Sequence, residues 1–115
     1  ASLYYNLHQN DKAIADYTDA IRCDPKLSVA YNNRGMIYAD AKQYDKAIAD
    51  YTEAIRLQPD STGAYMNRGT SYYHAKQYTN ALADLRKHLG LFPTDPEAAS
   101  IREMISLIEQ LNKTP

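Results

Sequence analysis

Small and large apolar residues recur along the chain at the three- and four-residue spacing of an α-helix. Between residues 45 and 57 the recurring positions form a single stripe of Ala47, Ile48, Tyr51, Ala54 and Ile55. The polar residues outside this stripe are Asp50, Glu53 and Arg56. Such a pattern predicts a helix that packs on one side. Helices are predicted over residues 1–8, 11–23, 28–41, 44–57, 62–75 and 78–91, and no strand is needed.

A further helix is predicted near the C-terminal end, over residues 95–112. Asp95 is a suitable N-cap residue, and Pro96 fits the first turn because its missing N–H has no partner there in any case. One face of this helix is apolar and consists of Ile101, Met104, Ile105, Ile108 and Leu111. The opposite face is polar, which is typical of a helix that closes the end of a repeat array.

The sequence before each of three prolines repeats. Pro25, Pro59 and Pro93 are 34 residues apart, and residues 1–25 match residues 35–59 at 14 of 25 positions. Each proline can end a helix, because its ring clashes with the preceding turn and it has no N–H to donate. The third copy diverges after Leu85, as expected of a terminal repeat. The chain is therefore an array of one repeated unit.

This period, with aromatic and small residues at fixed places, resembles the tetratricopeptide repeat, a helix-turn-helix unit. In the central copy the matching positions are Tyr31, Gly35, Tyr38, Ala47, Tyr51 and Ala54. The departures are Arg34, Arg68, Leu85 and His88. The resemblance implies an all-α, right-handed α-solenoid in one domain of residues 1–115. Its parts would be a partial repeat (1–25), two repeats (28–59 and 62–93) and a capping helix (95–112).

The packing of each repeat is expected to combine small and large residues. Gly35 and Ala47 lack bulk where two helices approach, and Tyr38 and Tyr51 fill the remaining space. In the first repeat only the second half of the first helix would be present, as if the chain were cut from a longer one. Apolar surface would then be exposed there, which favours association with another copy or with missing sequence.

Arg34 and Arg68 stand where the family usually has leucine, and each is followed sixteen residues later by an aspartate. We expect structural ion pairs, Arg34 with Asp50 and Arg68 with Asp84, or a link to the preceding repeat through Asp16. The alternative is that these arginines serve as basic residues that contact a ligand directly.

Composition excludes several functions. The net charge is −1 with both signs interspersed, so nothing predicts binding to nucleic acid or to anionic lipid. No apolar run reaches membrane-spanning length, so no membrane insertion is expected. The histidines His8, His74 and His88 occupy different repeat positions, and the single cysteine, Cys23, is expected to be a small apolar filler. We predict no metal, no cofactor and no catalytic activity.

The resemblance places binding residues on the concave face formed by the first helices of the repeats. The candidates are Tyr5, Asn6, Val29, Asn32, Asn33, Met36, Ala39, Asp40, Met66, Asn67, Thr70, Tyr73 and His74. Asn33 and Asn67 occupy the same position in consecutive repeats. Because a carboxamide both donates and accepts, such a pair can hold the backbone of an extended peptide. The alternative is that asparagine is merely a tolerated polar residue at this position.

Related co-chaperones hold the C-terminal carboxylate of heat-shock proteins with a clamp of lysines, arginine and asparagines. In this chain the clamp positions hold Asn32, Met36, Asn67, Glu97 and Ile101, and only Asn67 fits. Without a cation, and with Asp40 and Glu97 nearby, a heat-shock-protein carboxylate is an unfavourable ligand. We expect a neutral or mildly basic one.

Two functions follow from these features. The first is a non-catalytic scaffold for protein–protein interaction that binds an extended peptide in its groove. The second is a structural module that forms homo-oligomers through the exposed side of its first repeat. A third hypothesis is a targeting arm of a longer enzyme.

Overall fold

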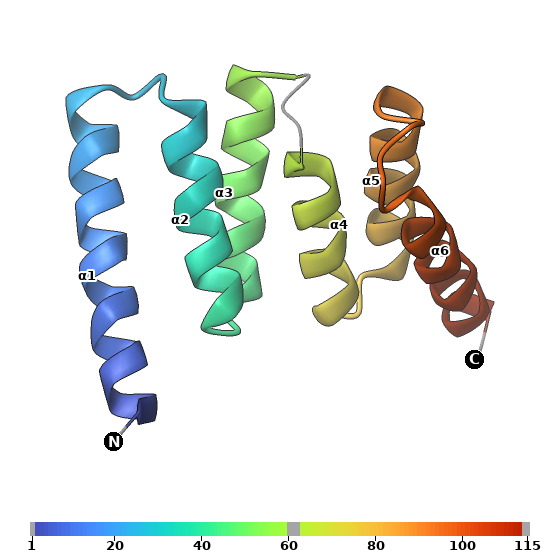
Figure 1. Ribbon diagram of the computed structural model, residues 1–115, viewed down its shortest axis with the longest axis horizontal. Helices are drawn as coiled ribbons and strands as arrows, with labels where there is room; N and C mark the ends of the chain where they lie inside the picture. The colour runs from blue at the N-terminus through green and yellow to red at the C-terminus, as the bar shows by residue number, and fades with distance from the viewer. Residues whose placement is uncertain (1, 60–62, 114–115) are drawn as a thin grey trace. The chain divides into compact units, whose positions relative to one another are not determined.

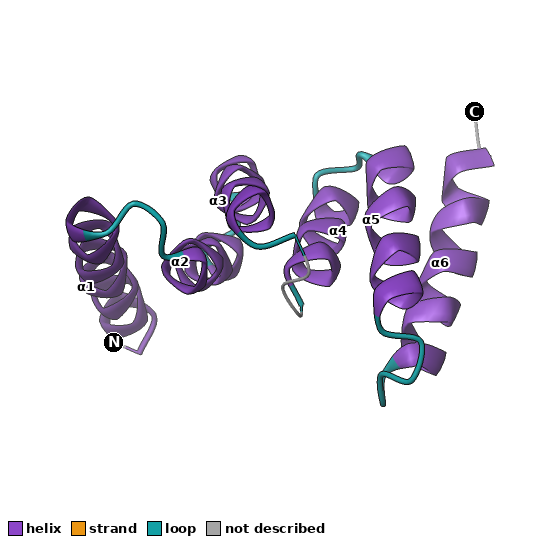
Figure 2. Ribbon diagram, turned by 90° about the horizontal axis from the view of Figure 1, so that it is seen from above, coloured by secondary structure: helices purple, strands orange, loops and turns teal. Residues whose placement is uncertain are grey.

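The computed structural model describes residues 2–59 and 63–113, and the side chains of residues 9–59 and 63–113. Every regular element within these ranges is an α-helix, as Figure 1 and Figure 2 show. The predicted all-α helical-repeat fold is therefore confirmed. The chain divides into two compact units, residues 1–59 and 60–115.

Unit 1 contains α1 (Ser2–Cys23), α2 (Ser28–Asp40) and α3 (Tyr44–Leu57). The middle helix α2 packs against both α1 and α3. Unit 2 contains α4 (Ala64–His74), α5 (Tyr78–Leu91) and α6 (Ala98–Lys113), and α5 packs against both of its neighbours. Each of the three helices α1, α3 and α5 ends two residues before one of the repeat's prolines, as the sequence predicts.

One prediction about the N-terminal helices is wrong. Residues 1–8 and 11–23 were expected to form two helices, but Ser2–Cys23 is one continuous helix. The break was expected at residues 9 and 10, directly after His8, which is the residue equivalent to Lys42 and Lys76, both of which adopt a positive φ. A left-handed residue costs roughly 1–2 kcal/mol, and a continuous helix avoids that cost.

The remaining boundaries lie close to the predicted ones. Helices α3 and α5 have the predicted bounds, and α2 ends one residue early. Residue 62, the predicted start of the next helix, lies outside the described residues, and α4 begins at Ala64 after Gly63 with φ 89°. Helix α6 begins at Ala98. The predicted start at residue 95 is therefore three residues early, and Asp95 Oδ1 instead accepts the Glu97 N–H at 2.8 Å in the turn that precedes the helix.

The turns inside the two hairpins have the same geometry. After α2 the Lys42 N–H donates to the Ala39 oxygen, and the Gln43 N–H donates to the Tyr38 oxygen at 2.8 Å. After α4 the N–H groups of Lys76 and Gln77 make the equivalent bonds. This is a Schellman ending, in which a left-handed residue satisfies the last carbonyl groups of the helix. It reverses the chain so that α3 packs on α2 and α5 packs on α4.

Close approach of the hairpin helices depends on glycine in the first helix. A Cβ added at Gly35 would lie 2.8 Å from Cε1 of Tyr51, a residue that is only 2% exposed. A Cβ at Gly69 would lie 3.1 Å from Cγ of Leu85. Leucine thus takes the place of tyrosine in the second hairpin without loss of burial, since Leu85 is also buried. The predicted small-against-large packing is present in both hairpins.

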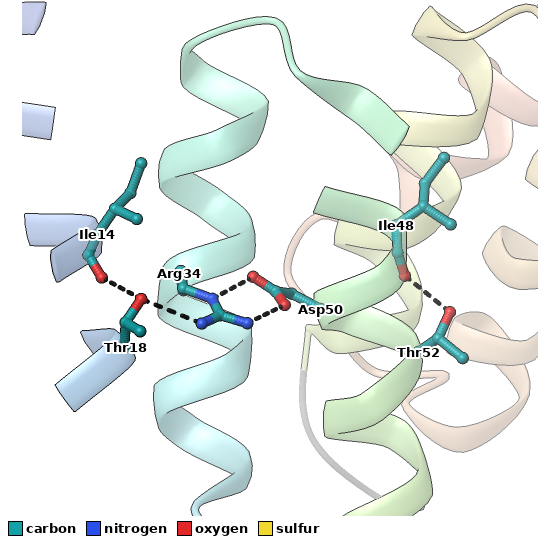
Figure 3. Close-up of polar contacts among 6 residues, drawn as sticks. All are labelled: Ile14, Thr18, Arg34, Ile48, Asp50 and Thr52. Atoms are coloured by element: carbon teal, nitrogen blue, oxygen red, sulfur yellow. Dashed lines mark hydrogen bonds and ion pairs between the residues drawn. The ribbon is translucent and has the colours of Figure 1, made fainter. Parts of the chain in front are cut away.

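A bidentate ion pair joins the two helices of each hairpin. Arg34 donates from Nε and Nη2 to the two carboxylate oxygens of Asp50, at 2.8 and 2.7 Å (Figure 3). Arg68 does the same with Asp84, at 2.7 and 2.8 Å. Asp50 and Asp84 are both buried. Asp50 therefore belongs to the packed side of α3, although it lies outside the apolar stripe in the sequence.

Tyrosine rings complete the surroundings of each arginine. The Arg34 guanidinium carbon lies 5.6 Å from the centre of the Tyr31 ring and 6.0 Å from that of Tyr38. Arg68 has the equivalent contacts with Tyr65 and Tyr72, at 5.6 and 5.8 Å. The hydrogen bonds that each guanidinium donates to its aspartate raise the pKa of both arginines above the usual value. Both arginines therefore remain charged and held in place by aromatic rings and a carboxylate.

The link from Arg34 to the preceding repeat runs through Thr18 rather than Asp16. Arg34 Nη1 donates to the Thr18 hydroxyl oxygen at 3.2 Å, and this hydroxyl donates to the Ile14 carbonyl oxygen at 2.7 Å (Figure 3). Thr52 repeats the second bond, to the Ile48 oxygen. Asp16 is exposed. The Thr18 hydroxyl is held in place by its hydrogen bond to the Ile14 carbonyl of the same helix. It is therefore better placed than the exposed Asp16 carboxylate to accept a hydrogen bond from Arg34.

The core of unit 2 lies between α5 and α6 and consists of Ala81, Leu82, Leu85, Ile101 and Ile108. His88 of α5, where the family usually has alanine, is 1% exposed, and its Nε2 lies 2.7 Å from Oδ2 of Asp95. Its other ring nitrogen, Nδ1, has no partner among the described residues. His88 therefore ties α5 to the turn that precedes α6. On α6 itself, Leu111 of the predicted apolar face is 37% exposed.

Gly35→Ala should destabilise the chain, because the new methyl group would overlap the Tyr51 ring. Overpacking typically costs about 1–3 kcal/mol, of which roughly 1 kcal/mol is returned by the better helix propensity of alanine. Gly90→Ala is the matched control, since a Cβ there meets nothing within 4 Å. Urea denaturation should show a lower midpoint for the first variant and an unchanged or higher one for the second. Equal shifts would contradict the packing argument.

Arg34→Met should lower stability by about 2–4 kcal/mol, because it leaves the buried Asp50 carboxylate without its partner. The double variant Arg34→Met, Asp50→Leu should recover most of the loss, since it removes the uncompensated charge. Arg56→Met removes an exposed pair with Glu53 on the same hairpin and should change little. The measurement is the melting temperature of the four chains. A melting temperature unaffected by Arg34→Met would show that the arginine is not structural.

Asp95→Asn tests the pH dependence of the α5–α6 connection. The Glu97 N–H and then His88 lower the pKa of Asp95 in the folded chain. A lowered folded-state pKa gives stability that is present above the unfolded value, roughly 3.9, and is lost as the pH falls through the folded value. The wild-type chain should therefore lose more stability than Asp95→Asn when acidified from pH 6 to pH 2.5. Parallel melting-temperature profiles would exclude this contribution.

Candidate functional site

Helix α2 presents one stripe of residues that its neighbours leave accessible. Val29 is 64% exposed and Met36 is 45% exposed, and Asp40 at the end of the helix is exposed as well. Asn33 lies between them at helical spacing, partly exposed, and its carboxamide has no hydrogen-bond partner among the described residues. Spacings of four, three and four residues place all four side chains on one face of the helix. We call this the α2 face: Val29, Asn33, Met36 and Asp40.

Two further candidates on α2 lie beside this face. Asn32 and Ala39 are partly buried. Asn32 takes part in side-chain interactions within the structure. Its carboxamide is therefore less available to a ligand than that of Asn33.

Helix α4 carries the equivalent positions of the second repeat in unit 2. We call Asn67, Thr70 and His74 the α4 face. Asn67 is partly exposed, His74 is exposed, and both have interactions within the structure. The Thr70 hydroxyl donates to the Met66 carbonyl oxygen at 2.9 Å, so it can offer a ligand only its acceptor lone pair.

The two apolar candidates of α4 serve the core of their own unit. Met66 and Tyr73 are partly buried and pack against the cluster that contains Leu85 and Ile101. The Tyr73 ring also lies 5.3 Å from the His74 ring and 6.1 Å from the Tyr78 ring. Only part of the Met66 and Tyr73 side chains is therefore accessible to a ligand. The side chains of Tyr5 and Asn6 lie outside the described residues.

Neither α2 nor α4 has an arginine or lysine that is outside an ion pair. Each helix carries one such residue, Arg34 or Arg68, and each is held by a buried aspartate of its own hairpin. This favours the structural role over direct ligand contact. Ile101, one of the predicted clamp positions, is buried in the core of unit 2. The sequence missed the Thr18 contact, although Thr18 lies sixteen residues before Arg34 just as Asp50 lies sixteen after it.

Among the described residues no group of three or more histidine, cysteine, aspartate or glutamate side chains could hold a metal ion. Nor is any helix in those ranges long and apolar enough to cross a bilayer. Cys23 is exposed, so the prediction that it is an apolar filler is wrong. It is the last residue of α1, at the point where the chain leaves the packed part of the helix.

A shallow hollow of about 440 Å³ lies at the connection between α5 and α6 in unit 2. It is lined by Leu91, Phe92, Pro93, Thr94, Asp95 and Pro96. The hollow is open to solvent, and the Asp95 carboxylate on its wall is engaged by Glu97 and His88. None of the residues predicted to bind a ligand lines it.

Several solved tetratricopeptide domains have folds similar to that of this chain. The first such domain of Spaghetti (RPAP3), bound to the HSP90 peptide SRMEEVD, has a TM-score of 0.84 and 27% identity, over 98% of this chain and 87% of that one. The Arabidopsis OM64 domain has a TM-score of 0.80 and 28% identity, covering 91% and 87%. The TPR2B domain of yeast Sti1, in complex with pHsp70, has a TM-score of 0.80 and 26% identity, covering 96% and 90%. No curated protein sequence matches the chain.

Sequence models described as Tetratricopeptide repeat match residues 35–106, 16–49 and 1–27. The first of these alone spans more than half of the chain. Together with the helical hairpins, their glycine contacts and the similar solved domains, this confirms the resemblance seen in the sequence: the chain belongs to the tetratricopeptide repeat family.

Proposed function

We propose that this chain is a non-catalytic protein-interaction module whose α2 face binds an extended, neutral or basic peptide segment. The observation that carries the proposal is the α2 face itself. Exposed apolar side chains flank a carboxamide that has no partner within the described residues. Such a surface offers both hydrogen bonds and apolar contact to a ligand. Membership of one repeat family is the reason for expecting the same kind of contact on the α4 face of unit 2.

Asn33 is the residue best placed to hold a peptide backbone. Its carboxamide can donate to a carbonyl oxygen and accept from an N–H of an extended chain. Asn67 occupies the same repeat position on α4, and the contacts it already has would orient its carboxamide. Backbone recognition of this kind is independent of the peptide's side chains, so the flanking residues must supply the selectivity.

Met36 and Val29 supply apolar contact on either side of Asn33. The thioether of methionine is flexible and polarizable, so it adapts to side chains of different shape. Met66 and Tyr73 contribute less than the sequence suggests, because they pack partly against the core of unit 2. The apolar selectivity is therefore expected to reside mainly on α2.

The charge of the site favours a neutral or basic ligand. The solved relatives include domains bound to acidic heat-shock-protein peptides that end in Glu-Glu-Val-Asp. In this chain the arginines of α2 and α4 are neutralised by Asp50 and Asp84. The exposed charges at the predicted clamp and wall positions are the acidic Asp40 and Glu97. A terminal carboxylate would meet no free lysine or arginine on either face and would be repelled.

Selection of linear 12-residue peptides from a random phage-display library tests this proposal. Peptides that bind the wild-type chain, measured by fluorescence anisotropy, should bind the Asn33→Ala, Asn67→Ala variant roughly tenfold more weakly, because two hydrogen bonds are lost. Asn112→Ala, an exposed asparagine of α6, is the matched control and should have no effect. The selected sequences should be poor in aspartate and glutamate.

Three outcomes would contradict the proposal. The double variant could bind the selected peptides as well as the wild-type chain does. The peptide SRMEEVD could bind more tightly with a free C-terminal carboxylate than with an amide, which would establish a carboxylate clamp. Finally, the wild-type chain could select no peptide and sediment as an oligomer, which would favour the alternative function of a self-associating structural module.

A further inference from the structure

Asp40 is an acid at a helix end that favours a base. The peptide dipoles of a helix leave negative potential at its C-terminus, so a basic residue there is stabilising and an acidic one is destabilising. Among the described helices only α2 has no basic residue in its last turn. The last turns of the other five contain Arg22, Arg56, His74, His88 and Lys113. Asp40, the last residue of α2, instead adds a negative charge there, at the turn into α3 (Figure 1).

No ion pair within the described chain neutralises Asp40. Its side chain is exposed and has neither an ion pair nor a hydrogen bond among the described residues. Lys42, in the turn that follows, makes no ion pair, and the Lys46 ammonium lies 5.6 Å from the centre of the Tyr38 ring. Burial raises the pKa of Tyr51, and the charge of Asp40 raises this pKa further. The negative potential of Asp40 therefore extends into the hairpin.

The fold does not require an acid at this position. The residue 34 positions later, at the end of α4, is His74. Helix α4 packs against α5 as α2 packs against α3, so both hairpins form with different residues at this point. A residue that opposes a local electrostatic preference without making a structural contact is a candidate for a role in binding.

We propose that Asp40 determines the specificity of the α2 face by binding the side chain of a lysine or arginine in the peptide ligand. This inference rests on the proposed function, and it goes further because it requires one basic side chain at a fixed place in the ligand. The carboxylate would accept a charge-assisted hydrogen bond from the ammonium or guanidinium group. The same cation would offset the negative end of α2, which no base of that helix does.

Met36 supplies the second half of this contact. It lies four residues before Asp40, so the two side chains are neighbours on the helix surface, and Met36 is 45% exposed. Lysine and arginine place their methylene stems on apolar surface while the charged group remains in water. The stem would lie against the Met36 thioether, which adapts to its shape, while the charged group reaches Asp40. A short polar or acidic side chain cannot make both contacts.

The place of the basic residue in the ligand follows from the length of the α2 face. Asn33 and Asp40 are seven residues apart, which is roughly 10 Å along the axis of an α-helix. An extended peptide advances about 3.3 Å per residue, so this distance corresponds to about three of its residues. The basic residue should therefore lie within about three positions of the residue whose backbone Asn33 holds.

Parallel selections from a library of linear 12-residue peptides displayed on phage test the inference. The wild-type chain should select peptides with lysine or arginine at one fixed position of the consensus. Asp40→Lys reverses the charge and should lose this enrichment and gain aspartate or glutamate at the same position. Asp16→Lys is the matched control, because it makes the same change at an exposed acid of α1 and should select the wild-type sequences.

A double-mutant cycle then measures the contact. The probe is a wild-type-selected peptide, acetylated and amidated so that its termini carry no charge, and binding is measured by fluorescence anisotropy. Asp40→Asn should weaken binding roughly fivefold, and Asp16→Asn should have no effect. Glutamine in place of the peptide's basic residue should weaken wild-type binding by a similar factor and leave binding to Asp40→Asn unchanged. Salt at about 1 M should remove most of the difference.

The melting temperature separates a binding role for Asp40 from a structural one. Asp40→Asn removes an unfavourable charge from the end of α2, so its melting temperature should equal or exceed that of the wild-type chain. Weaker binding by a variant that is at least as stable cannot result from partial unfolding. A lower melting temperature together with unchanged peptide selection would show that Asp40 serves the fold.

Four further results would overturn the inference. The selected peptides could contain no basic residue at a fixed position; Asp40→Lys could select the same sequences as the wild-type chain; or acetylation alone could abolish binding, which would assign the cation to the peptide's N-terminus. If Asn33→Ala, Asn67→Ala still weakens binding in these cases, the proposed function stands and only the role of Asp40 fails. A wild-type chain that selects no peptide would overturn both.

Discussion

The buried ion pair between the two helices of each hairpin is the interaction on which the rest of the structure depends. Arg34 with Asp50, and Arg68 with Asp84, each place a fully charged group inside a helix pair that glycine has brought close together. A buried charge is tolerated only with good geometry and enough hydrogen bonds, and the bidentate contact and flanking tyrosines provide both. The pair therefore specifies how the two helices fit, and neither residue can be exchanged alone.

The same pair also limits the positive charge that α2 and α4 can offer to a ligand. An exposed arginine on the first helix of a repeat could pair with the carboxylates of an acidic peptide. Here the second helix supplies an aspartate that neutralises it, and Thr18 occupies a further donor of Arg34. What remains exposed on α2 is an apolar stripe, an asparagine and an aspartate. The ion pairs and the proposed ligand preference both depend on Arg34 and Arg68, which stand where the family usually has leucine.

Repetition also allows residues at equivalent positions of different repeats to be compared. Helices α1 and α3 carry the same alanine–tyrosine–alanine positions, and the residues of α3 are buried because α2 packs against them. His88 gives the opposite case, a residue without a counterpart in the other repeats. Its bond to Asp95 fixes the connection to α6, and a buried nitrogen without a partner remains as the cost of that arrangement.

The sequence by itself determined the repeat, the family, most helix boundaries and the two arginine–aspartate pairs, because all of these follow from periodicity and from residues at fixed spacing. For the candidate binding faces, the sequence identified the residue positions but not their exposure or their contacts. The tertiary structure decided that Met66 and Tyr73 belong largely to a core, that Cys23 is exposed, and that Thr18 rather than Asp16 accepts from Arg34. It also decided that α1 is continuous. These outcomes depend on which neighbour covers each residue, and local sequence does not contain that information.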